Sequence, residues 1–439
     1  MIKLNASRLA ACTFFMLTLS GLGRGETGEI IVSPNITQTT VQASSYLPVT
    51  ILGNAIPALI NVPVSKISAL SFRNNALAII PFQIDKRDPK GRYDLSNKDN
   101  TQNLLLDKRD ECVFMAADAG DRIERLAKYF AQQPAVEIGI VDPQTGNRKW
   151  VYLVASPPDQ KPAHIAQRYV SYDADKDSIE TAIYRIGFSG AYPFLIDNLQ
   201  WHTSLPEKWT RNVADTMKIR HVGKLLGQPF VRTQADYRSR LVAVKEGPVR
   251  IIRRTLNTVR ILGFLQSPSA SIDHIAFANG FQMDTTVDFP FPLGWFFSDI
   301  KTYTTIDWND DPSLPVTWIY QTSLSKELVI NGKMTKEKEL FNQTGGQQFA
   351  IQNSYGLILI QLVVEKDFPI IANSFLLDDR TQADPPENIP GQFGNIGFLS
   401  SNWEKVDTAP HHLLFNVLLL QKASLEQGFK ALEHFPGRK

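Results

Sequence analysis

The stretch Lys245-Glu-Gly-Pro-Val-Arg-Ile-Ile-Arg-Arg-Thr-Leu-Asn-Thr-Val-Arg-Ile-Leu-Gly-Phe264 joins a Gly-Pro start to a run of β-branched residues. Val, Ile and Thr pack well on a pleated strand, and they lose rotamer freedom in a helix. The apolar positions also fit one face of a helix, but the composition favours a strand. We therefore predict a strand over 249–262, with Arg250 and Arg254 on one face and Arg253 on the other.

The same stretch lies in the most basic part of the chain. Residues 211–260 contain twelve Lys or Arg and three acids, whereas the whole chain has 46 basic and 44 acidic residues. The positive charge is therefore a local feature. On one strand face, Arg250 and Arg254 stand roughly 13 Å apart, a spacing that suits a repeating anionic polymer. The alternative is that these arginines pair with acids between Asp367 and Glu387.

The length of the chain indicates two domains. Its 439 residues exceed the roughly 250–300 that one hydrophobic core usually holds. Hydrophobic residues make up 43% and charged residues 21%, which excludes a disordered or collagen-like protein. Three prolines in Ser156–Pro162 indicate an extended spacer. We predict an N-terminal β domain over 26–155, a Pro-rich linker over 156–165 and a C-terminal β-sandwich domain over 166–439.

Residues 1–25 have the three parts of a secretory signal peptide. Lys3 and Arg8 are positive, residues 9–22 are apolar, and small residues follow at a suitable cleavage site. The apolar run is shorter than the about 20 residues that span a bilayer. Cys12 lies in a sequence like a lipid-attachment box, but the apolar run follows that cysteine, which favours ordinary cleavage. We expect an exported protein, periplasmic or extracellular, with no transmembrane span in the mature chain.

Cleavage leaves a single cysteine, Cys112, so we expect no internal disulfide. Cys112 lies in an apolar run, which favours a buried thiol over a nucleophile. Removing Lys3, Arg8 and, with later cleavage, Arg24 takes the 46 basic residues to 44 or 43, against 44 acids. Export and this near-zero net charge both argue against nucleic acid as a partner.

Short β-branched runs broken by Pro, Gly or Asn recur along the chain, as in antiparallel sheets. Asn279-Gly280 and Asn331-Gly332 have the chemistry of two-residue hairpin turns. These patterns predict a mostly β fold, in which an N-terminal antiparallel β-sandwich-like domain precedes a larger antiparallel β-sandwich domain, with few short helices. The segment 380–397 has three prolines, three glycines and no apolar periodicity. We expect a long loop there, which is uncommon unless the loop is functional or mobile.

Common catalytic signatures are absent from the sequence. It contains no Gly-x-Ser-x-Gly, His-Glu-x-x-His, phosphate-binding loop or Cys-x-x-Cys motif. Acidic turns offer the hard oxygen ligands that Ca²⁺ prefers, but interleaved cations or Asx turns account for them better. We expect no cofactor, with Ca²⁺ as the alternative. The candidate ligands are Asp85, Asp88, Asp94, Asp307 and Asp311.

Tryptophans and arginines are the predicted carbohydrate-binding residues. Aromatic faces pack against sugar rings, and arginines neutralise acidic groups on a glycan. Core packing is the alternative for the aromatic residues, and we expect Trp295 to reach the surface. The predicted substrate-binding residues are Arg238, Arg240, Arg250, Arg254, Trp295 and Trp308.

These patterns predict an exported carbohydrate-binding protein with an electropositive face for an anionic polysaccharide. One alternative is a carbohydrate-active enzyme such as a polysaccharide lyase. In that enzyme, Tyr237 or His221 is the base and an arginine neutralises a uronate carboxylate. Another is a non-catalytic envelope protein that docks on a cell-surface partner. A hydrogen-bonded structural role is the alternative for His221.

Overall fold

The computed structural model describes residues 36–96, 104–130, 133–156, 166–203, 208–312, 314, 317–320, 327–344 and 346–436. The predicted signal peptide, Cys12 and residues 157–165 of the predicted linker lie outside these ranges. Pro34–Lys439 forms one compact unit, and its division into two domains at 156–165 stays a prediction.

Two sheets form the part of the chain before residue 156. Their strands are β1 (Ile36–Gln42), β2 (Pro48–Leu52), β3 (Ile67–Arg73), β4 (Ala76–Ile79), β5 (Gln83–Asp85), β6 (Glu111–Met115), β7 (Ala135–Val141) and β8 (Arg148–Ala155). One sheet has the order β1, β7, β8, β3, β4, and the other has the order β2, β6, β5. Alternate residues such as Val136 of β7 and Phe114 of β6 share one core. β1 pairs with β7 in parallel, an exception to the predicted antiparallel arrangement.

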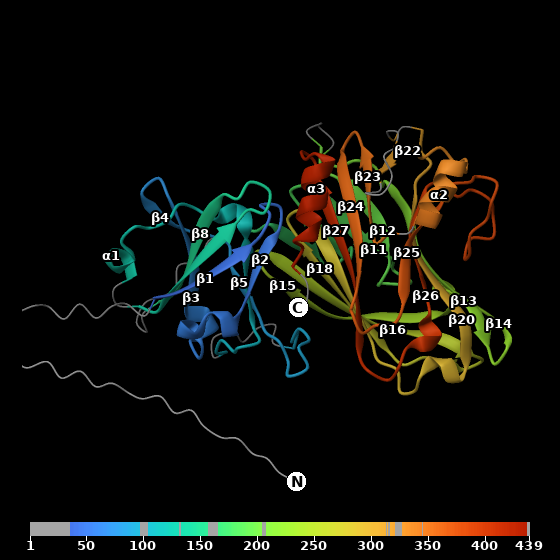
Figure 1. Cartoon of the computed structure of the whole chain (residues 1–439), viewed down its shortest axis with the longest axis horizontal. Coiled ribbons are helices and arrows are strands. Elements are labelled where there is room, and N and C mark those ends of the chain that lie inside the picture. The colour runs from blue at the N-terminus through green and yellow to red at the C-terminus, as the bar shows by residue number, and fades with distance from the viewer. Residues whose placement is uncertain are drawn as a thin grey trace, which may run out of the picture. The chain divides into compact units, whose positions relative to one another are not determined.

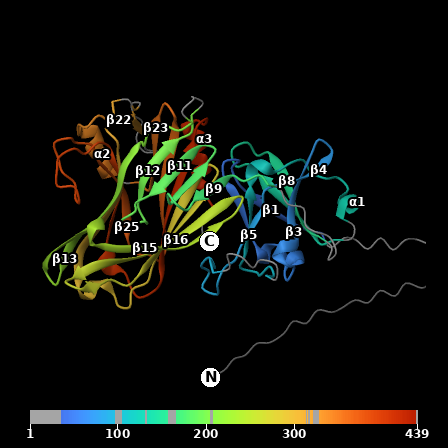
Figure 2. The same ribbon diagram turned by 180° about the vertical axis from the view of Figure 1, so that it is seen from behind.

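The largest sheet in the described part of the chain contains ten strands. They are β15 (Tyr237–Glu246), β16 (Arg250–Leu262), β17 (Leu265–Gln266), β18 (Ala270–Phe277), β19 (Gly280–Val287), β21 (Trp318–Tyr320), β22 (Leu328–Val329), β23 (Gln348–Asn353), β24 (Gly356–Val364) and β27 (His411–Leu420). The order is β15, β16, β18, β19, β27, β24, β23, β21, β22, with β17 paired to β16. The predicted strand over 249–262 is therefore confirmed, and it lies next to the edge strand β15 (Figure 2).

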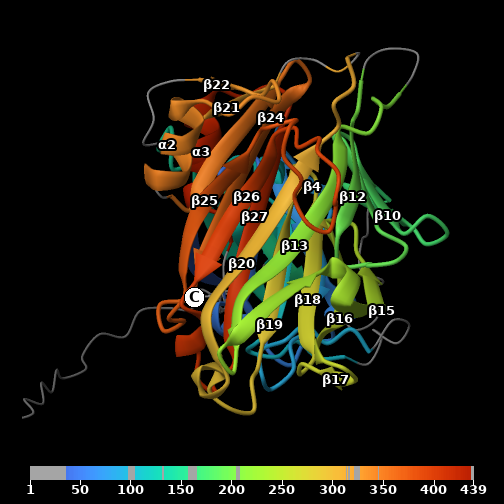
Figure 3. The same cartoon turned by 90° about the vertical axis from the view of Figure 1, so that its right-hand side faces the viewer.

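Two smaller sheets cover one face of the ten-stranded sheet. Their strands are β9 (Val170–Asp173), β10 (Ser178–Thr181), β11 (Tyr184–Phe188), β12 (Ile196–Trp201), β13 (Ala214–Leu225), β14 (Gln228–Thr233), β20 (Phe297–Trp308), β25 (Ile371–Leu377) and β26 (Asn395–Ser401). β9–β12 form a four-stranded sheet, and the five-stranded sheet has the order β14, β13, β20, β26, β25. Figure 3 shows β25, β26, β20 and β13 side by side. One apolar core joins the three sheets, so the mostly β, sandwich-like fold is confirmed.

Three short α-helices among the described residues complete the fold: α1 (Leu126–Phe130), α2 (Lys336–Thr344) and α3 (Leu425–Glu433). Ser424 and Gln427 form a capping box that begins α3, and Leu432 packs into a core beside β24 and β27 (Figure 1). Within the described residues, the helices are all too short and too polar to cross a bilayer.

The hairpin predictions for the two Asn-Gly pairs have different outcomes. Asn279-Gly280 joins β18 to β19, as predicted for a hairpin. Asn331-Gly332 lies between β22 and α2, so the second hairpin prediction is wrong. The buried carboxylate of Asp378 accepts hydrogen bonds from the backbone N–H groups of Asn331 and Gly332, at 3.0 and 2.8 Å. A distant side chain therefore holds this turn, in place of a second strand.

Candidate functional site

Two neighbouring strands of the five-stranded sheet, β13 and β20, carry most of the polar groups with possible function. Met217 and Ile306 are paired across the two strands and face the core, as does Trp308. Lys218 and Asp307 are the next residues along each strand and point to the opposite face. Alternation along two strands thus places an aromatic wall on one side and charged groups on the other.

A pocket of about 280 Å³ opens where β20 ends. Trp308 and Phe393 give it aromatic walls, and carboxylate, amide and guanidinium groups supply polar contacts. The indole N–H of Trp308 is buried and has no hydrogen-bond partner among the described residues. The lining residues are Val213, Trp308, Asn309, Asp310, Asp311, Pro312, Leu314, Thr317, Ile330, Asn331, Asn353, Arg380 and Phe393. We call this the Trp308 pocket.

Two buried carboxylates hold the walls of the Trp308 pocket. Asp307 Oδ1 accepts hydrogen bonds from the backbone N–H groups of Trp308 and Phe393, at 3.1 and 3.3 Å. Asp378 Oδ1 accepts from the N–H of Gly394 at 2.9 Å, in addition to its bonds to the 331–332 turn. Asp307 of β20 therefore holds one end of the segment 378–394, which connects β25 to β26, and Asp378 ties the other end to Gly394 and to the 331–332 turn. This segment is the long loop predicted over 380–397.

The charges at the Trp308 pocket balance. Arg380 donates from Nε and from one terminal nitrogen to the two carboxylate oxygens of Asp310, each at 2.6 Å. Arg211 donates to Asp311 Oδ2 at 3.0 Å. Two acids thus meet two arginines, and the guanidinium of Arg380 also lies 4.8 Å from the centre of the Phe393 ring. Arg380 and Asp310 are both partly exposed, so a ligand hydroxyl has access to them.

An acidic triad lies on the opposite face of the same strands. Oxygen atoms of Asp215, Asp307 and Glu387 lie within 4.8 Å of one another, a spacing that allows a shared cation. The buried ammonium of Lys218 is already there: it donates to Asp307 Oδ2 at 3.0 Å, to Gln392 at 2.8 Å and to Glu387. The lysine supplies the positive charge that a metal ion would bring, and Ca²⁺ stays the alternative to a protein without a cofactor.

Burial changes the pKa of two triad carboxyl groups. It raises the pKa of Asp307 to about 6, and the nearby ammonium of Lys218 offsets only part of that effect. Burial, then the negative charge of Glu387, raises the pKa of Asp215. Asp307 therefore titrates just below neutral pH while it holds the walls of the Trp308 pocket.

The other predicted metal ligands lie apart from the triad. Asp85 contacts Lys245 at 2.7 Å, and Asp311 contacts Arg211. Asp88 and Asp94 accept hydrogen bonds from backbone N–H groups in their own turns. Of the five predicted ligands, Asp307 is the one that the structure places in the acidic triad.

The two predicted catalytic residues lie in contact, although they belong to different strands. His221 Nε2 lies 2.7 Å from the hydroxyl of Tyr237, and His221 Nδ1 lies 2.8 Å from Thr302 Oγ1. Burial lowers the pKa of His221 to about 4, against a small opposing effect of Asp236, so the imidazole is neutral at pH 7. Burial also raises the pKa of Tyr237, which keeps its hydroxyl protonated. The pair is a neutral acceptor beside a neutral donor.

Two of the four predicted arginines are engaged in ion pairs. The buried Arg250 donates from Nε to Asp85 Oδ2 at 2.7 Å, and its terminal nitrogen contacts Glu111. Arg254 donates to both carboxylate oxygens of Asp273, at 2.6 and 2.7 Å. The alternative reading, that these arginines pair with acids, therefore holds, but the acids between 367 and 387 are the wrong partners: the carboxylates come from strands β5, β6 and β18.

The remaining predicted residues lie at the surface. Arg238 and Arg240 are exposed on β15. Trp295 is 69% exposed, as expected, and its ring lies nearly parallel to that of Phe291. Of the six predicted substrate-binding residues, Trp308 is the one that lines the pocket. The binding roles of the other five stay predictions.

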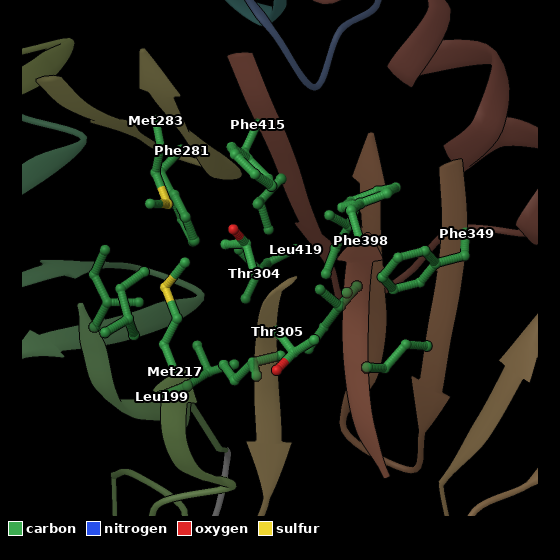
Figure 4. A pocket seen from close by; sticks show the side chains of 18 of the residues that line it. Leu199, Met217, Phe281, Met283, Thr304, Thr305, Phe349, Phe398, Phe415 and Leu419 are labelled. Atoms are coloured by element: carbon green, nitrogen blue, oxygen red, sulfur yellow. The ribbon is translucent and has the colours of Figure 1, made fainter. Parts of the chain in front are cut away.

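A second cavity, of about 70 Å³, lies inside the core between the sheets. Figure 4 shows Met217, Phe281, Met283 and Phe415 among the side chains that line it. Its walls are almost wholly apolar, so they offer little to orient a hydroxylated ligand. We therefore prefer the Trp308 pocket to this cavity as the candidate site.

Comparisons with known proteins give no family. No protein-family model matches the sequence, and no curated protein matches it. An α-mannosidase from Enterococcus faecalis V583 is similar in structure, with a TM-score of 0.39 and 9% identity over 90% of this chain and 44% of that chain. A 4-α-glucanotransferase from Thermococcus litoralis has a TM-score of 0.28 and 11% identity over 56% and 38%. This chain spans less than half the length of either, and such TM-scores carry no argument about function.

Proposed function

We propose that this chain is an exported carbohydrate-binding protein whose ligand occupies the Trp308 pocket. The observation that carries the proposal is the pocket lining, in which Trp308 and Phe393 stand beside Asp, Asn and Arg side chains. Aromatic rings pack against the apolar face of a sugar, and planar polar groups bind its hydroxyls. A volume of about 280 Å³ is near the lower end for small-molecule sites, which suits the end or a short segment of a glycan.

The balanced charge of the pocket favours a neutral sugar at this position. Selection of an anionic polysaccharide, as the basic stretch predicts, depends instead on exposed arginines outside the pocket, because Arg250 and Arg254 already have carboxylate partners. Binding of a neutral sugar in the pocket and binding of an anionic polysaccharide to exposed arginines differ in their response to salt. Screening weakens exposed charge contacts over about 10 Å at 0.1 M salt but leaves aromatic stacking and neutral hydrogen bonds.

A glycan array probed at low and moderate salt tests this function, followed by titration of the best ligand with two variants. Arg380→Ala removes a polar wall of the pocket and should weaken binding about tenfold or more. Lys224→Ala is the matched control, because the Lys224–Asp299 ion pair is also exposed on the surface but lies outside the pocket. The absence of any bound glycan, or equal binding by Arg380→Ala and the unmodified chain, would overturn the proposal.

A polysaccharide lyase is the second candidate function, and the contact between His221 and Tyr237 favours it. In a lyase reaction, a base removes the proton at C5 of a uronate, the C4–O bond breaks, and a C4=C5 double bond forms. A neutral imidazole can accept the C5 proton, and a protonated phenol can donate to the departing oxygen. His221 and Tyr237 have these two states at pH 7.

The lyase function is tested by following the ultraviolet absorbance of unsaturated products during incubation with uronate polymers. Tyr237→Phe should abolish the increase, since it removes the proton donor and leaves the ring in place. Tyr355→Phe, which changes a tyrosine at another site, is the control. An unchanged rate in Tyr237→Phe, or no product from any uronate polymer, would exclude this function.

A further inference from the structure

The basic stretch 211–260 contains two arginines that differ from the rest. Ten of its twelve Lys and Arg side chains contact carboxylates or backbone carbonyls of the folded chain. Arg238 and Arg240 are the other two: both are exposed, and neither has an ion pair or hydrogen-bond partner among the described residues. The charge that the fold leaves unused is therefore concentrated at two positions.

Both arginines lie on β15, which is an end strand of the ten-stranded sheet. β15 pairs with β16 on one side, and no described strand pairs with its other side (Figure 2). Apart from the N–H of Tyr237, which donates to the carbonyl of Gln234, no described backbone group outside β16 bonds to the main chain of β15. A row of unpaired N–H and C=O groups is thus available along this edge, which is a template for an added strand.

The register of β15 places the two arginines on the same face. Pairing with β16 is regular from Tyr237 to Leu241 and shifts between Leu241 and Ala243. Within the regular segment, the cross-strand neighbours of Arg238 and Arg240 are Thr258 and Leu256, and neither is an acid. Alternate residues on one strand face stand roughly 7 Å apart, so an added strand with acids at alternate positions would meet both guanidinium groups.

We propose that β15 is a docking edge for an extended acidic peptide segment of a partner protein. Main-chain hydrogen bonds supply the ladder, and carboxylates on alternate residues pair with Arg238 and Arg240. Leu241, 37% exposed, offers an apolar contact at the end of the same segment. A polysaccharide has no backbone amides that match a strand ladder, so the edge favours a peptide.

A second copy of this chain is a poor occupant of the same edge. β15 carries Arg238, Arg240 and Lys245 but a single acid, Glu246. Two copies paired through β15 would bring like charges together, which is destabilising across strands. An acidic segment has the complementary charge.

Fluorescence anisotropy with a short labelled peptide of alternating Glu and Val tests the docking. The peptide should bind the unmodified chain, and binding should weaken as salt increases. The double variant Arg238→Glu and Arg240→Glu should bind about tenfold or more weakly. The matched control is the double variant Arg148→Glu and Lys149→Glu, which reverses two exposed charges on β8 and should bind as the unmodified chain does.

Three further measurements distinguish strand addition from binding in another mode. Successive residues of an added strand direct their N–H groups to opposite edges, so two peptides are needed, one N-methylated at the Glu residues and one at the Val residues. Equal binding by both peptides would exclude the ladder. Binding of polygalacturonate in place of the peptide, with loss in the same arginine variant, would identify a glycan edge and overturn the proposal. Self-association of the unmodified chain that is lost in the Arg238→Glu and Arg240→Glu double variant would also overturn the proposal. Unchanged thermal unfolding of both double variants would show that they fold.

Discussion

The Nε atom of Arg250 lies 2.7 Å from Oδ2 of Asp85, although the two residues are 165 positions apart in the sequence. The contact joins the most basic strand of the chain to β5 and is completed by Glu111 and Lys245. All four side chains are largely buried, so each charge depends on the others for compensation. The basic stretch is therefore first a structural element, and only its edge remains for binding.

Asp85→Asn should destabilise the chain by about 3–5 kcal/mol at pH 7, because it leaves buried cations with one carboxylate fewer. Burial alone would raise the pKa of Asp85, but Arg250 and Lys245 outweigh it and lower the pKa to about 2. Unfolded Asp titrates near 4, so this stabilisation is present above pH 4 and is lost as pH falls from 4 to 2. Urea unfolding across this range should show less acid dependence in the variant, whereas Asp121→Asn, an exposed control, should keep it.

Asp307→Asn should change the pH dependence in the opposite direction. The pKa of Asp307 is raised to about 6 in the folded chain, against 3.8 as the ordinary value. Between pH 4 and 6 the folded state therefore binds a proton that the unfolded state does not, and stability decreases as pH rises through this range. The variant should lose this decrease, which is worth about 3 kcal/mol for a buried carboxyl. The free energy of unfolding is measured between pH 4 and 6, with Asp175→Asn as the control. An equal dependence on pH in Asp307→Asn and in the unmodified chain would contradict the raised pKa of Asp307.

Tyr237→Phe should lower the free energy of unfolding by about 1–3 kcal/mol, because it leaves His221 Nε2 in a buried position without its partner. Chemical denaturation at pH 7 measures this effect without reference to catalysis. Equal stability of the variant would mean that water or another group replaces the phenol, and would argue against a tight contact.

Gly394→Ala should destabilise the chain and weaken glycan binding at the Trp308 pocket together. Gly394 has a φ of +61°, and an added Cβ would lie 2.5 Å from Ile330 Cδ1 and 3.1 Å from Trp308 Cδ1. Strain at such a position costs about 1–3 kcal/mol. Gly190→Ala is the control, since nothing lies within 4 Å of its added Cβ. Unchanged unfolding and binding in Gly394→Ala would show that the Trp308 wall can move freely.

The elements that the sequence predicted well are those with local signals. The strand β16 follows from the β-branched composition of 249–262, and the Asn279-Gly280 hairpin follows from its turn chemistry. The partners of Arg250 had no local signal, because strand pairing over more than a hundred residues sets them. Asn331-Gly332 had the correct turn residues, but Asp378 determines its surroundings.

The Trp308 pocket was predicted only in fragments. Trp308 was recognised as a possible sugar contact, and the loop near 380–397 was recognised as unusual, but nothing in the sequence connected them. No pattern in the sequence identified Arg380, Phe393 and Asp310 as pocket residues. The same holds for Lys218 and Glu387 as neighbours of Asp307 in the acidic triad. The Asp-rich turn at 307–311 was interpreted as a possible metal site, whereas the structure gives these acids to arginine, lysine and backbone partners.

The place of β27 in the ten-stranded sheet has a consequence for biosynthesis. β27, near the C-terminus, pairs with β19 on one side and β24 on the other, so it joins the two halves of the sheet. While the ribosome is still translating residues before 411, both neighbouring strands lack their partner. Assembly of the main core must therefore wait until residues 411–420 have left the ribosome, and a chain truncated before β27 should be recognised by chaperones and proteases.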